Sequence, residues 1–189
     1  MQRRGRSMAI SLSSTVSSKA SRALAVVVMG VSGAGKTVVG RRLAEALGAD
    51  FIDGDDLHTD AARAKMASGH PLTDEDRWPW LDRTASVLRE GLNRNVATIV
   101  ACSALRRVYR ERLRERVGGG LRFVYLKADR DLMRGRVAGR RGHYMPASLV
   151  DSQFATLEPP DGELDVVVMP ADAELGAAIP KLAAELKGR

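Results

Sequence analysis

Residues 30–37 read GVSGAGKT and fit the pattern G-x-x-x-x-G-K-[ST]. That pattern needs a buried strand before it and an amphipathic helix after it, and the chain supplies both. Residues 23–29 form an apolar run rich in valine, which is typical of a strand buried on both faces of a parallel sheet. Residues 36–47 place apolar side chains at helical spacing, and Gly48 is a suitable C-cap. The stretch therefore predicts an α/β fold.

The residue types within this stretch favour the binding of a nucleoside triphosphate. Glycines let the backbone curl so that successive N–H groups point at one phosphate, and the following helix adds its N-terminal dipole. Lys36 is long enough to reach the β- and γ-phosphates, and the Thr37 hydroxyl is a suitable Mg²⁺ ligand. The residues expected to bind the nucleotide are Gly30, Ser32, Gly33, Ala34, Gly35, Lys36 and Thr37.

Strand-like and helix-like segments alternate along the rest of the chain. The further strands are expected at 50–53, 96–102, 121–128 and 164–169. The further helices are expected at 56–68, 79–92, 104–117, 129–138, 147–155 and 172–187. This alternation predicts a five-stranded parallel sheet sandwiched by helices, in one domain that spans residues 23–189.

Residues 1–22 differ in composition from the rest of the chain. They are rich in serine, contain five basic residues and no acid, and so carry five of the seven net positive charges. This composition predicts a disordered basic extension, although an organelle transit peptide or a start site assigned too early (Met8 is a second candidate) also fits. The remaining charges are nearly balanced, which argues against a nucleic-acid partner.

Two further features indicate where the protein functions. No stretch approaches the ~20 continuous apolar residues that a membrane-spanning helix requires, so we expect no membrane partner. The single cysteine, Cys102, rules out an internal disulfide and fits a reducing compartment such as the cytoplasm. Cys102 itself is expected to be a small buried apolar residue.

Three carboxylates, Asp53, Asp55 and Asp56, follow the short strand at 50–53. Ligands of parallel sheets bind beyond the carboxyl ends of the strands, so these acids are expected near the phosphates. We expect Asp53 to face the Mg²⁺ shell through water and Asp55 to orient an acceptor hydroxyl towards the γ-phosphate. Asp56 is expected to cap the next helix. The alternative is that all three only cap and solvate a loop.

Four segments of the chain resemble the gluconate kinases (gluconokinases). They are GVSGAGKT; GDDLH with KMASGHPLTDEDRWPWL; CSALRRVYRERLR; and GHYMPASLVDSQFATLEPP, and together they cover the chain from about residue 24 to its end. The resemblance implies a P-loop kinase fold with an arginine-rich lid. It also implies ATP- and Mg²⁺-dependent phosphorylation of D-gluconate at its 6-hydroxyl, giving 6-phospho-D-gluconate and ADP. Dimers are common in this family, so a homodimer is consistent with it.

The resemblance also implies roles for residues outside the phosphate-binding loop. Arg77 is similar to the arginine that grips the substrate, although a surface ion pair with Asp74 or Asp76 is the alternative. Trp78 and Trp80 are expected to pack around Pro79, which is expected in the first helical turn. The residues expected to bind the acceptor are Asp55, His58, Arg77, His143 and Gln153. The residues expected to act in catalysis are Lys36, Asp55 and Arg136.

Residues 134–145 are rich in arginine and contain three glycines, which is typical of a mobile lid. Arg136 and Arg140 are expected to reach the phosphates on closure, with Arg141 in reserve. The alternative is a solvated basic loop. His143 could equally be structural, and Gln153 could equally be solvated on a helix.

The chain departs from the gluconokinase pattern at three positions, Thr59, Ala62 and Tyr144, none of them in the phosphate-binding loop. Ser103 and Arg106 could also border the pocket. Two other functions remain open on the sequence. One is a kinase of the same architecture that acts on a different small molecule. The other is a nucleotide-dependent nucleic-acid-binding module, which the pI near 10.1 suggests.

Overall fold

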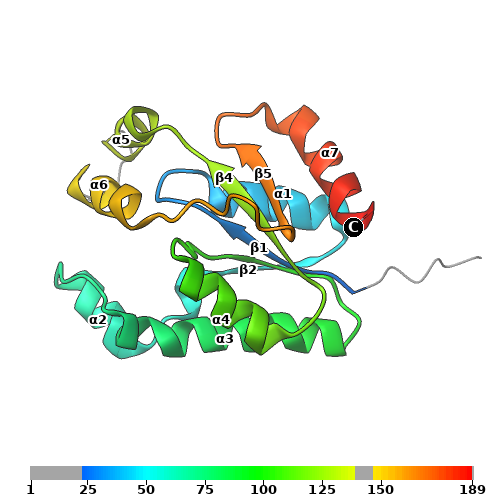
Figure 1. Cartoon of the computed structure of the whole chain (residues 1–189), viewed down its shortest axis with the longest axis horizontal. Helices are drawn as coiled ribbons and strands as arrows, with labels where there is room; N and C mark the ends of the chain where they lie inside the picture. The colour runs from blue at the N-terminus through cyan, green and yellow to red at the C-terminus, as the bar shows by residue number, and fades with distance from the viewer. Residues whose placement is uncertain (1–22, 139–146, 189) are drawn as a thin grey trace, which may run out of the picture.

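Five parallel strands form the centre of the molecule in a computed structural model that describes residues 23–138 and 147–188 (Figure 1). Their order across the sheet is β2-β3-β1-β4-β5. The strands are β1 (Ala25–Met29), β2 (Asp50–Asp53), β3 (Thr98–Ala101), β4 (Leu121–Lys127) and β5 (Val166–Pro170). The predicted parallel α/β sheet is confirmed. The predicted extension at 1–22 and most of the predicted lid lie outside the described residues.

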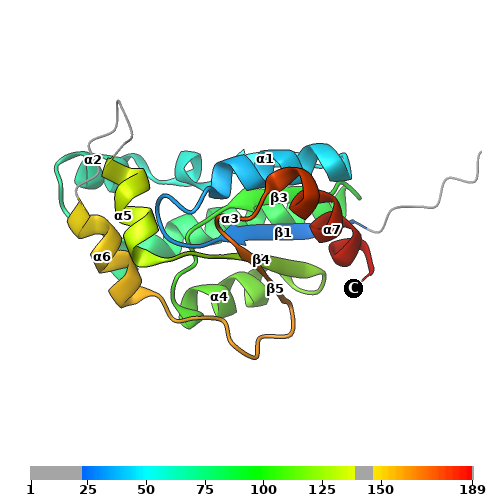
Figure 2. The same ribbon diagram turned by 90° about the horizontal axis from the view of Figure 1, so that it is seen from above.

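Helices cover both faces of this sheet. Helices α1 (Lys36–Leu47) and α7 (Leu175–Gly188) pack on one face, and α3 (Asp74–Asn93) and α4 (Arg107–Val117) on the other (Figures 1 and 2). Three helices lie beyond the carboxyl ends of the strands: α2 (Asp60–Ala67), α5 (Arg130–Ala138) and α6 (Ala147–Thr156). Within the described ranges, none of these helices has the length and apolar character needed to cross a membrane.

The central strand β1 connects two apolar cores. All five of its side chains are fully buried, as its valine-rich sequence predicts. Val26 and Val28 join the core beneath α1 and α7, whereas Val27 and Met29 join the core beneath α3 and α4. Successive side chains of a strand point to opposite faces, so this one strand anchors helices on both sides. The phosphate-binding loop therefore begins from the most deeply buried part of the fold.

Helix α3 begins earlier than predicted. Thr73 is its N-cap and forms a capping box with Asp76, in which each side chain accepts a hydrogen bond from the other residue's backbone N–H. The prediction that Pro79 lies in the first turn is therefore wrong, because Pro79 lies inside the helix. Proline cannot donate a backbone hydrogen bond, so the capping box stabilises the turn that Pro79 weakens.

The predicted helix at 56–68 is divided in two. A short 3₁₀ helix, η1 (Gly54–Leu57), is followed by α2, whose N-cap is Thr59. Thr59 accepts a hydrogen bond from the backbone N–H of Ala62 at 3.0 Å. The prediction that Asp56 caps this helix is therefore wrong, because Asp56 lies inside η1. Thr59 and Ala62 are two of the three positions that depart from the gluconokinase pattern. In this chain the two residues form the cap at which α2 begins.

Arg110 fixes the loop that leads from β3 into α4. Its side chain is fully buried and donates to the carbonyl oxygens of Ala104 and Leu105, each at 3.1 Å. It also binds both carboxylate oxygens of Glu163. Ala104 has a φ of 43°, which a non-glycine residue rarely adopts. The buried guanidinium thus holds a strained loop against the segment before β5.

We expect Arg110→Ala to lower the free energy of unfolding by about 3 kcal/mol, because Glu163 loses a buried partner and two carbonyl groups lose their donors. Urea denaturation measures this change. Arg107→Ala is the control, because Arg107 forms an exposed pair with Glu111 at 2.8 Å on the same helix. Its expected cost is about 0.5 kcal/mol or less. Equal losses in the two variants would contradict this role of Arg110.

Candidate active site

The loop at 30–37 connects β1 to the N-terminus of α1. Gly35 is the N-cap of α1 and has a φ of 92°, a left-handed conformation that glycine adopts without strain. Since no side chain caps this helix, its first N–H groups can bind an anion. The ammonium group of Lys36 donates to the carbonyl oxygen of Val31 at 3.1 Å and so lies over the loop. This arrangement is a phosphate-binding loop.

A hydrogen bond joins this loop to the acidic strand end. The Thr37 hydroxyl donates to Oδ2 of Asp53 at 2.9 Å. A hydroxyl and a carboxylate are hard oxygen ligands of the kind that Mg²⁺ prefers, and they meet beside the phosphate-binding N–H groups. The residues present therefore fit the predicted Mg²⁺ site. Among the described residues, no three acidic, histidine or cysteine side chains form a cluster that could hold a metal by themselves.

Asp55 lies on the turn that follows. The backbone N–H of Asp55 donates to Oδ1 of Asp53 at 3.2 Å, so one carboxylate both caps η1 and meets Thr37. The turn lies so close to β3 that a Cβ at Gly54 would be 2.3 Å from the carbonyl oxygen of Ala101. Only glycine therefore allows this approach. The Asp55 side chain is exposed, and the described residues offer its carboxylate no hydrogen bond.

Cys102 lies close to both the phosphate-binding loop and the turn that carries Asp55. It is buried at the carboxyl end of β3, as predicted. Burial raises the pKa of its thiol to about 12, and the charges of Lys36 and Asp55 act on it in opposite directions. The next residue, Ser103, accepts a hydrogen bond from Gly30 at the start of the phosphate-binding loop, and Gly54, which precedes Asp55, packs against Ala101 and Cys102. The phosphate-binding loop and the turn that carries Asp55 thus meet at the carboxyl end of β3.

His58 lies beneath this edge in the fold interior. Its side chain is 5% exposed and stacks on Trp80 at a ring-centroid distance of 4.4 Å. Trp80 donates from Nε1 to the carbonyl oxygen of Gly54 at 2.6 Å, which confirms its predicted role in packing. Burial is the main cause that lowers the pKa of His58. Its Nδ1 atom is buried and has no hydrogen-bond partner among the described residues.

Arg77 contacts a carboxylate and a phenol at the start of α3. Its Nη1 atom lies 3.1 Å from the Tyr109 hydroxyl and 3.4 Å from Oδ1 of Asp74. The ion pair with Asp74 that the sequence suggested is therefore present. Asp76 instead pairs with Lys65 at 2.6 Å, and this hydrogen bond is the main reason that the pKa of Asp76 falls to about 2.

Two predicted residues lie on the helices beyond the strands. Arg136, on α5, is exposed and donates to the carbonyl oxygen of Ala171 at 3.0 Å, so it contacts the β5–α7 connection. The Gln153 carboxamide, on α6, accepts a hydrogen bond from the backbone N–H of Ser32 at 2.6 Å. Gln153 therefore contacts the phosphate-binding loop directly. Four other predicted positions lie outside the described residues: Arg140, Arg141, His143 and Tyr144.

Sequence reasoning missed Tyr109 and Glu158. Tyr109 lies three positions after Arg106 in one of the segments quoted above, a helical spacing that would have placed the two side chains on one face. Glu158 accepts a hydrogen bond from the backbone N–H of Arg107 at 2.5 Å and so stabilises the start of α4 from a distant segment. Ser103 accepts a hydrogen bond at its carbonyl oxygen from Gly30 at 3.2 Å, so it does border the phosphate-binding loop.

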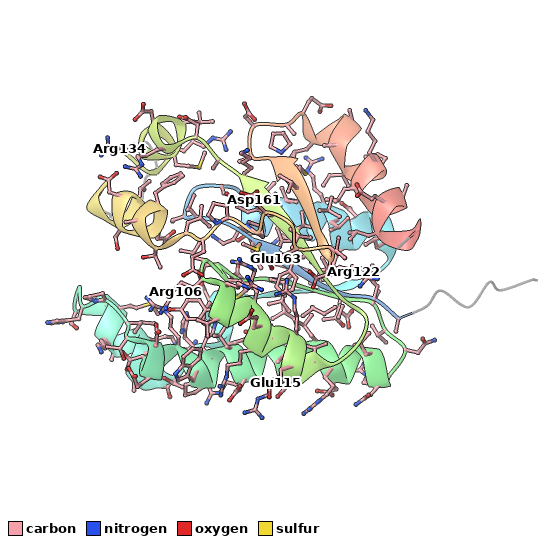
Figure 3. The ribbon with its side chains drawn as sticks, viewed as in Figure 1. Arg106, Glu115, Arg122, Arg134, Asp161 and Glu163 are labelled. Carbon is pink, nitrogen blue, oxygen red and sulfur yellow. The ribbon has the colours of Figure 1, made fainter. Side chains whose placement is uncertain are left out.

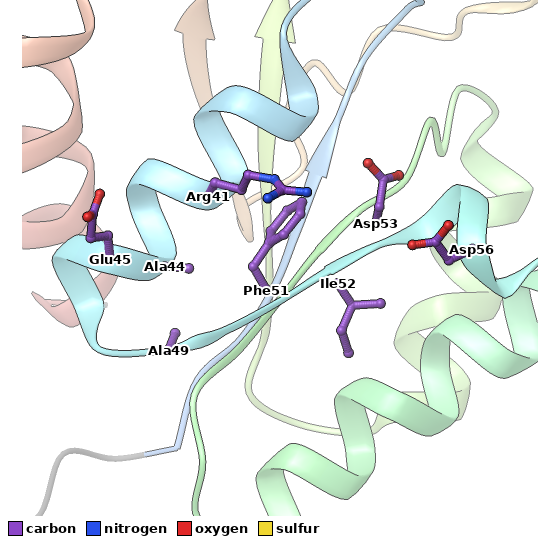
Figure 4. A pocket seen from close by; sticks show the side chains of 8 residues that line it. All are labelled: Arg41, Ala44, Glu45, Ala49, Phe51, Ile52, Asp53 and Asp56. Atoms are coloured by element: carbon purple, nitrogen blue, oxygen red, sulfur yellow. The ribbon is translucent and has the colours of Figure 1, made fainter.

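A cavity of about 520 Å³ adjoins this site along β2 and α1 (Figure 4). Asp53 belongs to both the cavity and the phosphate-binding site. Arg41 crosses the cavity and lies over the ring of Phe51, 5.3 Å from its centroid. The remaining lining residues are Ala44, Glu45, Ala49, Ile52 and Asp56. Ala44 and Glu45 come from the later part of α1 and the others from Ala49 onward, away from the loop amides, so the cavity is a neighbour of the site.

The parallel sheet, the phosphate-binding loop and the Thr37–Asp53 pair define the class of P-loop kinases. The family model described as "AAA domain" matches residues 26–160. The chain is 46% identical to the gluconokinase of Gluconobacter oxydans and 40% identical to a probable gluconokinase of Mus musculus. These matches cover 75% and 79% of this chain, and 79% and 90% of the relatives.

A solved structure agrees with these sequence matches. The crystal structure of a gluconokinase from Sinorhizobium meliloti 1021 superimposes with a TM-score of 0.76 at 44% identity. The match covers 87% of this chain and 92% of that one. The chain therefore belongs to the gluconokinase family.

We expect Asp53→Ala to weaken the binding of MgATP about tenfold, because the variant removes the carboxylate that faces the proposed metal shell. Isothermal titration calorimetry with MgATP, and with ATP in excess EDTA, measures this. Binding of metal-free ATP should change little. Asp56→Ala is the control, because Asp56 is exposed and close in sequence but makes no contact with Thr37. An equal loss with and without Mg²⁺ would contradict a metal role for Asp53.

Proposed function

We propose that this protein is an ATP-dependent gluconokinase. It transfers the γ-phosphoryl group of ATP to the 6-hydroxyl of D-gluconate and so forms 6-phospho-D-gluconate and ADP. The observation that carries this proposal is the exposed Asp55 carboxylate, two residues beyond the aspartate that binds Thr37. Membership of the gluconokinase family, over at least three quarters of the chain, supports the choice of acceptor.

The nucleotide is held by the backbone N–H groups of the phosphate-binding loop. In this proposal Gly30, Ser32, Gly33, Ala34, Gly35, Lys36 and Thr37 surround the phosphates. Lys36 stabilises the negative charge that spreads over the transferred group. When bound, Mg²⁺ neutralises charge on the β- and γ-phosphates, and Thr37 and Asp53 are the residues that would hold it, Asp53 through water.

Asp55 acts on the acceptor. Its carboxylate accepts a hydrogen bond from the 6-hydroxyl and so orients the oxygen atom towards the γ-phosphate. His58, Arg77, His143 and Gln153 are the further residues proposed to bind gluconate. The bond from Ser32 to Gln153 supports a place for Gln153 beside the phosphate-binding loop, close to where the two substrates meet.

An arginine-rich lid completes the proposed site. Arg136 and Arg140 approach the phosphates when it closes, with Arg141 as the alternative. Helix α5, which carries Arg136, is joined to α6 by a bidentate pair between Arg134 and Asp151, at 3.0 and 2.6 Å. These two helices can therefore move as one unit. Among the described residues, such a motion has to release the hydrogen bond of Arg136 to the carbonyl oxygen of Ala171 and that of Gln153 to the backbone N–H of Ser32.

We also propose a setting for this activity. Residues 23–189 form one kinase domain, and residues 1–22 form an extension that takes no part in catalysis. The protein acts in the cytoplasm on a small molecule, without nucleic-acid or membrane partners, and a homodimer is compatible with the family. The buried thiol of Cys102 supports a location that does not depend on disulfides.

The test is a coupled assay of ADP release with a panel of acceptors. It includes D-gluconate, other sugar acids, shikimate and nucleoside monophosphates, each with MgATP. We expect kcat/KM to be highest for gluconate and ³¹P NMR to locate the new phosphate on O6. Turnover of shikimate or a nucleoside monophosphate without turnover of gluconate would overturn the proposal.

A further inference from the structure

One carboxylate in the first turn of α3 binds three side chains. Oδ1 of Asp74 accepts hydrogen bonds from the Tyr109 hydroxyl at 2.5 Å and from Nη1 of Arg77 at 3.4 Å. Oδ2 of Asp74 accepts a hydrogen bond from Nη1 of Arg106 at 2.5 Å. The Tyr109 hydroxyl hydrogen bond is the main cause that lowers the pKa of Asp74, so this carboxylate is charged near neutral pH. Two arginines thus converge on one anion.

Tyr109 lies between these arginines and fixes their direction. Its hydroxyl accepts a hydrogen bond from Arg77 while donating to Asp74. Its ring lies 5.7 Å from the guanidinium carbon of Arg77 and 5.5 Å from that of Arg106, which allows cation–π attraction. The ring in turn meets Trp78 edge-on at 5.7 Å. A buried aromatic side chain therefore restrains both arginines.

This cluster borders the proposed acceptor site. Arg106 is the N-cap of α4, just beyond β3, and Figure 3 places it at the end of the sheet where α2 and α6 lie. Three residues after Arg77 on α3, Trp80 donates from Nε1 to the carbonyl oxygen of Gly54 at 2.6 Å, and Gly54 directly precedes Asp55. The helix that carries Arg77 therefore contacts the turn that carries Asp55. The cluster lies on the same side of the sheet edge as the aspartate that orients the acceptor.

The bonds of Arg77 leave one edge of its guanidinium open. Only Nη1 is engaged, and neither Nε nor Nη2 binds another residue in the described part of the chain. A carboxylate fits that edge through two parallel hydrogen bonds. Arg77, Asp74 and Arg106 are between 29% and 37% exposed. A ligand can therefore reach them and still be partly shielded from water, which strengthens the interaction.

Arg106 has a second acidic neighbour. Oε1 of Glu158 lies 3.7 Å from Nε of Arg106, while its Oε2 accepts a hydrogen bond from the backbone N–H of Arg107 at the start of α4. The two guanidinium groups thus face two carboxylates, and Asp74 is the one that contacts both arginines. The position for an incoming carboxylate is therefore the open edge of Arg77.

We infer that Asp74 and Tyr109 are positioning residues that hold Arg77 and Arg106 as the receptor for the carboxylate of the acceptor. This inference rests on the proposed function, in which the acceptor is a sugar acid. In this account the cluster receives the carboxylate end of the substrate and Asp55 receives its far hydroxyl. The preference for a sugar acid over a neutral polyol arises at this cluster.

The test compares D-gluconate with D-gluconamide, which carries a neutral amide in place of the carboxylate. Kinetic constants are measured for the wild-type chain, Tyr109→Phe and Asp74→Asn. Tyr109→Phe keeps the ring and its packing on Trp78 but removes the hydroxyl that bridges Arg77 and Asp74. We expect both variants to raise KM for gluconate about tenfold, with little change in KM for ATP. The ratio of kcat/KM for gluconate to that for gluconamide should fall about tenfold.

Asp82→Asn is the matched control. Asp82 joins the same two helices through a bidentate pair with Arg112, at 2.8 Å for both hydrogen bonds, but lies two turns further along α3. If Asp74 only ties α3 to α4, then Asp74→Asn and Asp82→Asn will lower the melting temperature alike and leave the substrate ratio at its wild-type value. That result would overturn the inference. If the wild-type chain does not phosphorylate gluconate, the proposed function fails instead.

Discussion

The hydrogen bond between Thr37 and Asp53 is the contact on which the site depends. These residues come from the loop after β1 and from the end of β2, and β3 lies between those two strands in the sheet. The bond therefore spans β3, and the segment after β2 also approaches the end of β3 at close range. Gly54 permits this approach, because any side chain there would collide with the carbonyl oxygen of Ala101. Sheet order, a glycine and a helix terminus together place the acids beside the phosphate-binding loop.

Several arginines of the described residues have specific partners. Arg110 is fully buried and has acceptors for its donors in Glu163 and two carbonyl groups. Arg77 and Arg106 share the carboxylate of Asp74. Many arginines of the described domain are therefore paired with acids in the interior and around the site. The high pI comes mostly from residues 1–22, which carry five of the seven net positive charges.

Much of the site was predictable from sequence because it depends on local patterns. The loop at 30–37, the valine-rich first strand and the acids after the second strand are each encoded within a few residues. The parallel topology then brings them to one edge without further information. The packing of Trp80 and the burial of Cys102 were also predicted correctly.

The incorrect predictions concern helix starts, where two nearby residues both resemble a start signal. The missed contacts join residues that are distant in sequence. Pro79 suggested a helix start, but the capping box at Thr73 begins the helix five residues earlier. Asp56 resembled an N-cap, whereas the 3₁₀ turn after β2 leaves that position to Thr59. The contacts of Tyr109 with Asp74, and of Glu158 with Arg107, cross between segments that no short pattern connects.

The most direct test of this account is the single-turnover rate of phosphoryl transfer to gluconate in Asp55→Asn, measured by quenched flow at saturating MgATP. Asparagine keeps the size of the side chain but cannot accept the hydroxyl proton. The account predicts that the rate falls about a hundredfold or more while the affinity for MgATP is unchanged. A variant that transfers phosphate at the wild-type rate would contradict it.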